Sequence, residues 1–90
     1  MAKSKNHHYV LVCTNRGPTF VTEILPHHEC KWSSEDAPLE MSATWADDMC
    51  VGLMWNGYPA YHVVVPYVLE SQPFIYKRGH FEWIDEKTEN

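Results

Sequence analysis

The clearest pattern in the chain spans residues 41–65, MSATWADDMCVGLMWNGYPAYHVVV, where the hydrophobic period changes partway along. From Ser42 onward the apolar side chains recur every three to four residues, which is the spacing of one face of a helix. Ser42 is a good N-cap, and Gly57 after Asn56 can take the left-handed conformation that ends a helix. The nearly continuous apolar run Ala60–Val65 then predicts a strand in the centre of a sheet.

The predicted helix carries one apolar stripe, which we expect to pack on the sheet. Its members are Ser42, Trp45, Ala46, Met49, Cys50, Leu53 and Met54. Val51 and Trp55 fall outside this stripe, so either the helix is buried on two sides or it presents an apolar edge outward. Asp47 and Asp48 lie opposite the stripe near the helix N-terminus, where the helix dipole favours negative charge.

Two strands are predicted before the helix, Tyr9–Thr14 and Thr19–Leu25, joined across the turn Asn15–Pro18. A four-residue loop would pair Cys13 with Phe20. Because side chains alternate along a strand, this register predicts one core face and one outer face. The core face would hold Tyr9, Leu11, Cys13, Phe20 and Ile24, and the outer face Val10, Val12, Val21 and Glu23.

A second hairpin is predicted near the end of the chain, from Pro73–Lys77 and His80–Asp85 across Arg78-Gly79. A two-residue loop pairs Tyr76 with Phe81 and Phe74 with Trp83, which puts four rings on one face. This ring face either packs on the core of the domain or anchors a protein partner or a second copy of the chain.

The 90 residues are enough for one domain, residues 1–90, with frayed tails at 1–6 and 86–90. The segment Glu29–Trp32 is predicted to form a short additional strand. Together the segments predict an α+β fold, in which a small antiparallel sheet packs on one amphipathic helix. The sheet would contain the N-terminal hairpin, the strand Ala60–Val65 and the C-terminal hairpin.

The charge of the chain argues against nucleic-acid binding, because the net charge is −5 and the seven Lys and Arg residues are scattered. No apolar run approaches the ~20 residues that span a bilayer, so we expect no membrane insertion. The N-terminal MAKSKNHH has no apolar signal segment behind it. Three cysteines without regular spacing fit reduced thiols. These features predict a cytoplasmic protein.

The most metal-like cluster is His27-His28-Glu29-Cys30, since imidazole, carboxylate and thiolate are all zinc ligands. Adjacent residues rarely supply several ligands to one tetrahedral ion, because their side chains diverge. Cys13 and Cys50 fall on predicted core faces, where a thiol is normally inert. We therefore predict no metal, no cofactor and no catalytic residue. A small metal-stabilised or enzymatic domain that uses the histidine-rich loop remains the alternative.

The order of elements resembles that of small orphan α+β proteins encoded by phages and prophages. The matching features are the hairpin Tyr9–Leu25, the pair Trp32-Ser33, the Ser-capped helix Ser42–Trp55 with Ala46, and the strand Ala60–Val65. This resemblance covers most of the chain and carries no catalytic residue across. It implies a protein that binds and inhibits a host or defence protein, as anti-CRISPR proteins do.

The sequence thus predicts a non-catalytic protein-binding module whose protein partner is of unknown identity. The resemblance implies that this module inhibits a host or defence protein. A structural protein that forms homodimers is a further alternative. The residues expected to contact the partner are Trp83, Phe81, Tyr76, Phe74, Trp55 and Val51.

Overall fold

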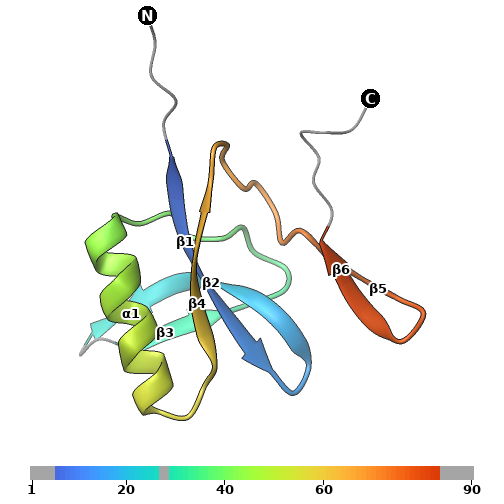
Figure 1. The fold of residues 1–90 in the computed structure, drawn as a ribbon, viewed down its shortest axis with the longest axis horizontal. Coiled ribbons are helices and arrows are strands. Elements are labelled where there is room, and N and C mark those ends of the chain that lie inside the picture. The colour runs from blue at the N-terminus through green and yellow to red at the C-terminus, as the bar shows by residue number, and fades with distance from the viewer. Residues whose placement is uncertain (1–5, 27–28, 84–90) are drawn as a thin grey trace, which may run out of the picture.

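The computed structural model describes residues 6–26 and 29–83, with the backbone alone at 75–77. Residues 1–5 of the predicted tail 1–6, the tail 86–90, the pair His27-His28, and Ile84 and Asp85 of the second hairpin lie outside the described residues. Within them the predicted α+β class is confirmed: one helix packs against a four-stranded antiparallel sheet (Figure 1).

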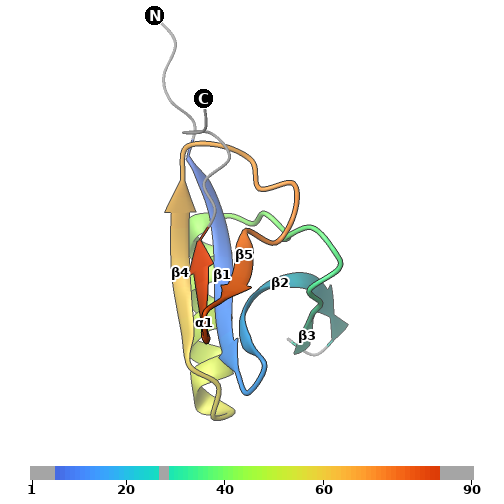
Figure 2. The same ribbon diagram turned by 90° about the vertical axis from the view of Figure 1, so that its right-hand side faces the viewer.

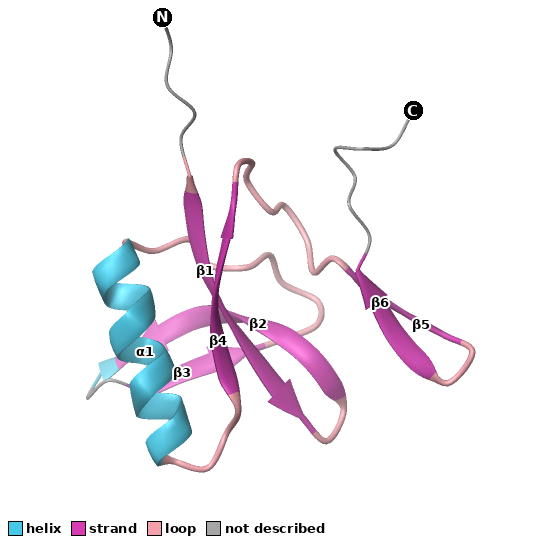
Figure 3. Cartoon of the chain, viewed as in Figure 1, coloured by secondary structure: helices cyan, strands magenta, loops and turns pink. Residues whose placement is uncertain are grey.

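The elements follow one another as β1 (His7–Thr14), β2 (Gly17–Leu25), β3 (Glu29–Trp32), α1 (Ala43–Trp55), β4 (Ala60–Val65), β5 (Phe74–Lys77) and β6 (His80–Trp83). The main sheet has the strand order β3-β2-β1-β4, and β5 and β6 form a separate two-stranded sheet, so the prediction that the C-terminal hairpin belongs to the main sheet is wrong. Figures 1 and 3 show α1 on one side of the main sheet and the β5–β6 hairpin on the other. The main sheet is therefore the middle layer of three.

The first hairpin is tighter than the sequence predicts. Leu11 lies opposite Phe20, so the register differs by two residues from the expected pairing of Cys13 with Phe20. The turn is only Asn15-Arg16, because Gly17, with φ of 109°, already belongs to β2. Only glycine adopts such a φ without strain, and it lets the chain reverse within two residues.

Both faces of the hairpin are buried, so the prediction of one core face and one outer face is wrong. The helix side of the sheet buries the very residues assigned to the outer face, Val10, Val12 and Val21. Tyr9 and Phe20, assigned to the core, are also fully buried, but on the opposite side. A register shift between Val21 and Glu23 turns the end of β2, and Ile24 packs with the helix-side cluster.

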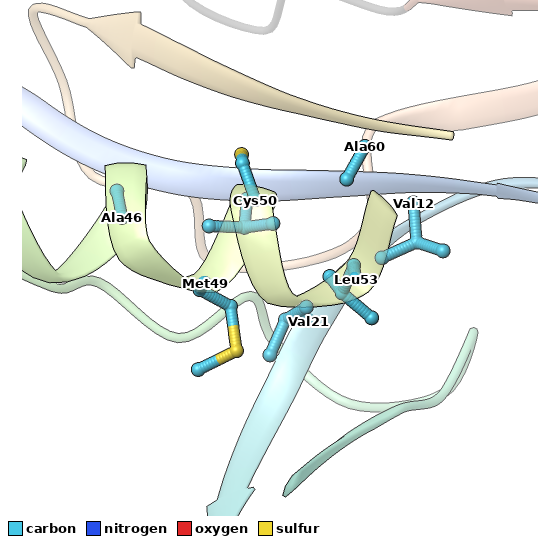
Figure 4. Packing of buried hydrophobic residues seen from close by; sticks show 8 residues of the cluster. Val12, Val21, Ala46, Met49, Cys50, Leu53 and Ala60 are labelled. Carbon is cyan, nitrogen blue, oxygen red and sulfur yellow. The ribbon is translucent and has the colours of Figure 1, made fainter. Parts of the chain in front are cut away.

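The helix begins and ends at the predicted residues. The Ser42 hydroxyl accepts a hydrogen bond from the Trp45 N–H at 3.1 Å, and Gly57 has a φ of 91°. The buried stripe is narrower than predicted, because Trp45 and Met54 are exposed. It consists of Ala46, Met49, Cys50 and Leu53, which meet Val12, Val21 and Ala60 in Figure 4.

The strand β4 is formed as predicted but does not lie in the centre of the sheet. It pairs with β1 in six consecutive antiparallel pairs, from His7–Val65 to Val12–Ala60, and forms the edge of the described sheet. Only the ends of its apolar run, Ala60 and Val65, are buried, whereas Tyr61 and Val64 are exposed, so the run does not indicate strands on both sides.

The linker 66–73 holds the second hairpin against the sheet through two polar contacts. The Leu69 N–H donates to the Tyr9 hydroxyl at 2.9 Å in a buried position. Gln72 accepts from the Phe20 N–H at 2.9 Å and donates to the Phe20 carbonyl at 3.2 Å, as a neighbouring strand would. The hairpin itself has the predicted register, with Arg78 and Gly79 both at positive φ, as two-residue turns require.

Candidate protein-binding surface

A groove of about 1140 Å³ lies between α1 and β3. Trp32 comes from β3, Trp45 and Trp55 from α1, and Tyr58 from the loop after α1. The rings of Trp32 and Tyr58 meet edge to face, with centroids 5.1 Å apart. Three of the four tryptophans of the chain therefore line one groove, although they are far apart in sequence.

Several apolar side chains of the groove are exposed to solvent. Those on α1 are exposed because the helix packs its opposite face on the core. Trp55 is 84% exposed, and Val51, Trp45 and Tyr58 are each exposed as well. A single exposed apolar side chain is ordinary, but four that share one groove form a patch. Trp and Tyr are also the side chains that most often supply binding energy at protein interfaces.

The charges in the groove are negative. Glu29 and Asp48 line it, and no Lys or Arg is among its described lining residues. The whole chain also carries −5. A segment with apolar side chains and at least one Lys or Arg would thus complement both the rings and the charge of the groove.

The thiols near the groove are not activated. Burial raises the pKa of Cys30, which lines the groove. Burial, and to a lesser extent the charge of Asp47, also raises the pKa of Cys50. A raised pKa keeps a thiol protonated, and the protonated thiol is a poor nucleophile and metal ligand. Cys30 therefore contributes to the groove as a small apolar side chain.

The rings of the second hairpin pack on the side of the sheet opposite α1, although Phe81 and Trp83 are still 39% and 37% exposed. Phe74 stacks on Phe20 at 5.7 Å, and Trp83 meets Phe20 edge to face at 5.8 Å. Phe81 lies over the first hairpin, where a Cβ on Gly17 would come within 2.3 Å of its ring. The side chain of Tyr76 is outside the described part of the structure.

The structure thus divides five of the six expected contact residues, all but Tyr76, between two places. Val51 and Trp55 lie in the groove, whereas Phe74, Phe81 and Trp83 cover the sheet on its other side. Sequence reasoning missed the other groove rings, Trp32, Trp45 and Tyr58. The exposure of Trp45 could have been suspected from its place at the border of the helical stripe, but no pattern connects Trp32 with Tyr58.

A chain of hydrogen bonds joins α1, β4 and β1 at the other border of the helix. His62 Nδ1 lies 2.7 Å from Asp47 Oδ1, and His62 Nε2 lies 2.8 Å from His8 Nδ1. A neutral imidazole has one N–H, so if His62 donates to the carboxylate, its other nitrogen accepts from His8; which nitrogen carries the proton depends on the tautomer. The contacts orient both rings and tie the helix to two strands. His8 and His62 are 54 positions apart in the sequence, and Asp47 and His62 are 15 apart, and no sequence motif connects them.

The histidine-rich loop is described only at Glu29, which is exposed, and Cys30. Across residues 6–26 and 29–83 no group of three His, Cys, Asp or Glu side chains could hold a metal ion. Within the same residues, no helix combines the length and apolar character that crossing a membrane requires.

Comparison with known proteins assigns no relative: no family model matches the chain, and no curated protein and no solved structure matches it. The surface itself is therefore the basis for any functional inference.

Proposed function

We propose that the protein is a non-catalytic module that binds another protein through the groove between α1 and β3. The observation that carries this proposal is Trp55, 84% exposed beside Trp45, Tyr58 and Val51. Leaving such a ring in water forgoes the free energy of its burial, about 25 cal/mol for each Å² of apolar surface. A partner that covers the groove would recover that free energy.

The partner expected from the groove chemistry is a segment that combines apolar anchors with basic residues. The rings would bury its apolar side chains, while Glu29 and Asp48 would pair with its Lys or Arg at the border. Charges at the border of an interface act mainly on the association rate and its salt dependence. The affinity should therefore depend chiefly on the rings, and the association rate should fall as salt is added.

The proposed role of this binding is inhibition of a host or defence protein. It is supported by the resemblance of the element order to small phage and prophage proteins, and by a chain of 90 residues that offers a groove but no activated thiol in it. A small acidic protein can block a basic functional site by covering it.

The first experiment identifies the partner by position-specific cross-linking in cells of the native host. A photo-reactive amino acid replaces Val51 in the groove in one sample and the equally exposed Val68, in the linker, in a control sample. A protein captured at position 51 and absent at position 68 is the expected result. Capture of the same proteins at both positions, or of none at position 51, would contradict binding in the groove.

The second experiment measures the affinity of the purified partner for two Trp variants. Trp55→Ala should weaken binding at least about tenfold, or about 1.4 kcal/mol, because it removes an exposed anchor without disturbing the core. Trp83→Ala tests the sequence expectation that the second hairpin is the interface. If Trp83→Ala weakened binding while Trp55→Ala did not, with both variants folded by circular dichroism, the groove would be the wrong surface.

A further inference from the structure

The edge of the sheet formed by β4 is regular along its whole length. All six residues, Ala60–Val65, pair with β1 without a register shift. Among the described strands only β1 lies beside β4, and β4 forms one margin of the molecule in Figure 2. One side of β4 therefore offers its backbone groups to another strand.

The backbone groups that face outward can be assigned from one hydrogen bond. The Cys13 N–H donates to the Pro59 carbonyl at 3.0 Å, so Cys13 and Pro59 form a hydrogen-bonded pair in line with the register of β1 and β4. In an antiparallel pair such positions alternate with positions that point away from the neighbour. It follows that Ala60, His62 and Val64 direct their N–H and C=O groups to the free side.

The opposite edge of the sheet, β3, has protection that β4 lacks. β3 is four residues long, carries Glu29 and Lys31, and pairs with β2 through a register shift. Short length, charges and bulges are the usual means by which an edge strand avoids pairing with other chains. In β4 none of these is present, and the run Tyr58–Val68 contains no Asp, Glu, Lys or Arg.

We propose that β4 pairs antiparallel with β4 of a second copy of the chain, with His62 of each copy opposite the other. Around His62, Ala60 lies opposite Val64 of the second copy and Val64 opposite its Ala60. Every outward N–H of the three residues then meets an outward C=O. The two four-stranded sheets become one continuous sheet with a two-fold axis perpendicular to it.

The two-fold register centred on the next residue, Val63, is less favourable because of proline. A pair centred on Val63 would place Ala60 opposite Pro66, which has no N–H to donate. The register centred on His62 also sets Tyr61 opposite Val63 of the second copy, an aromatic pair with a β-branched residue, twice by symmetry. The strand is thus complementary to itself in both backbone and side chains.

The charge of the chain also points to this edge as the place where two copies can meet. Two chains of −5 repel one another wherever carboxylates face each other. The carboxylate of Asp47 contacts β4 through His62, because its Oδ1 lies 2.7 Å from His62 Nδ1 in a hydrogen bond. The exposed side chains of the strand, Tyr61 and Val64, are uncharged.

The test is the oligomeric state of the full chain, measured by sedimentation equilibrium from micromolar to several hundred micromolar protein. Val64→Lys adds a charge at the proposed edge, where Val64 is 47% exposed. Val68→Lys adds the same charge at a Val that is 48% exposed outside the paired segment. We expect a wild-type dimer, at least about tenfold weaker dimerisation for Val64→Lys, and dimerisation within about twofold of wild type for Val68→Lys. A monomeric wild type, or equal effects of the two lysines, would overturn the proposal.

The register has its own test in His62→Cys. In a hydrogen-bonded antiparallel pair the two Cα atoms lie about 5.5 Å apart, within the range that a disulfide spans. Oxidised glutathione should therefore cross-link His62→Cys dimers, but neither the wild type with its three native cysteines nor Val68→Cys. A dimer sensitive to Val64→Lys that does not cross-link at position 62 would overturn the His62-centred register. Dimerisation and binding in the groove can fail separately, because the groove lies at the β3 edge.

Discussion

The helix covers one face of the sheet with mostly small and flexible side chains, whereas the linker and second hairpin cover the other face with rings. Val12, Val21 and Ala60 meet α1 on the first face. On the second, Tyr9 and Phe20 meet Val65 and Leu69 from distant parts of the chain, with Phe74 and Trp83 around them. Both faces are buried at their centres, but different interactions position the segments that cover them.

The helix is placed by a repeating apolar stripe, so many similar contacts share the stabilisation. The linker has no such repeat and is positioned by individual hydrogen bonds, one from the Leu69 N–H to the Tyr9 hydroxyl and one from the Phe20 N–H to the Gln72 side chain. We infer that the helix face should tolerate the loss of polar contacts, while the hairpin face should depend on a few residues.

The largest expected effect is that of Phe20→Ala. Phe20 is fully buried and its ring contacts those of Tyr9, Phe74 and Trp83. Its removal should lower the free energy of unfolding by about 3–5 kcal/mol, measured by urea denaturation. Hydrogen exchange should increase first in β5 and β6. Earlier exchange in α1 would mean that the two faces are not separately organised.

On the helix face the matching substitution is Leu53→Ala, with the neighbouring Met54→Ala as its control. Leu53 is buried against the sheet, so its truncation should cost about 2–5 kcal/mol. Met54 is 55% exposed, and its truncation should cost less than about 1 kcal/mol. Equal effects of the two in urea denaturation would show that the helix is rotated relative to the sheet.

These differences also explain how much could be predicted from the sequence. Local signals were sufficient for the helix with its Ser42 cap, for all six strands and for the register across Arg78-Gly79. Each depends on residues within a few positions of one another. The helical stripe predicted four buried residues correctly but also included Trp45 and Met54, which are exposed, because periodicity alone does not give the width of the buried face.

Features that depend on distant residues could not be predicted. The burial of Val10 and Tyr9 on opposite faces requires two covering layers, and nothing within the hairpin reveals a second one. The edge position of β4 and the meeting of Trp32 with Tyr58 have the same origin. The candidate groove combines three segments that only the fold brings together, so just Val51 and Trp55 were identified beforehand.

An intermediate effect is expected for Gln72→Ala. The substitution removes the acceptor of the Phe20 N–H and the donor to the carbonyls of Phe20 and Asp36. A partly buried N–H without a partner costs about 1–3 kcal/mol. The neighbouring Ser71→Ala, at an exposed position, should change the free energy of unfolding by less than about 0.5 kcal/mol. If both changes were equally mild, water would replace the Gln72 contacts without loss.

The smallest expected effect is a pH dependence that belongs to the hairpin face. Burial raises the pKa of Tyr9 above its ordinary value, and the charge of Glu40 adds to the rise, while the hydrogen bond from Leu69 opposes it. Between the two pKa values the unfolded chain has lost this proton and the folded chain has kept it. The free energy of unfolding should therefore fall as the pH rises above about 10, with the contribution fully present below that pH.

Tyr9→Phe isolates this contribution, because it removes the titrating group and keeps the ring. The variant should be less stable near neutral pH, since the Leu69 N–H loses its acceptor. It should also lose stability less steeply than the wild type as the pH is raised from about 9 to about 11, in urea denaturation at each pH. Burial of Cys30 and Cys50 raises the pKa of each thiol and produces a fall in the same direction, but equally in both proteins. If the free energy of unfolding fell equally with pH in the two proteins, Tyr9 would ionise as readily in the folded chain as in the unfolded one. The Tyr9 hydroxyl would then be accessible to water in the folded protein.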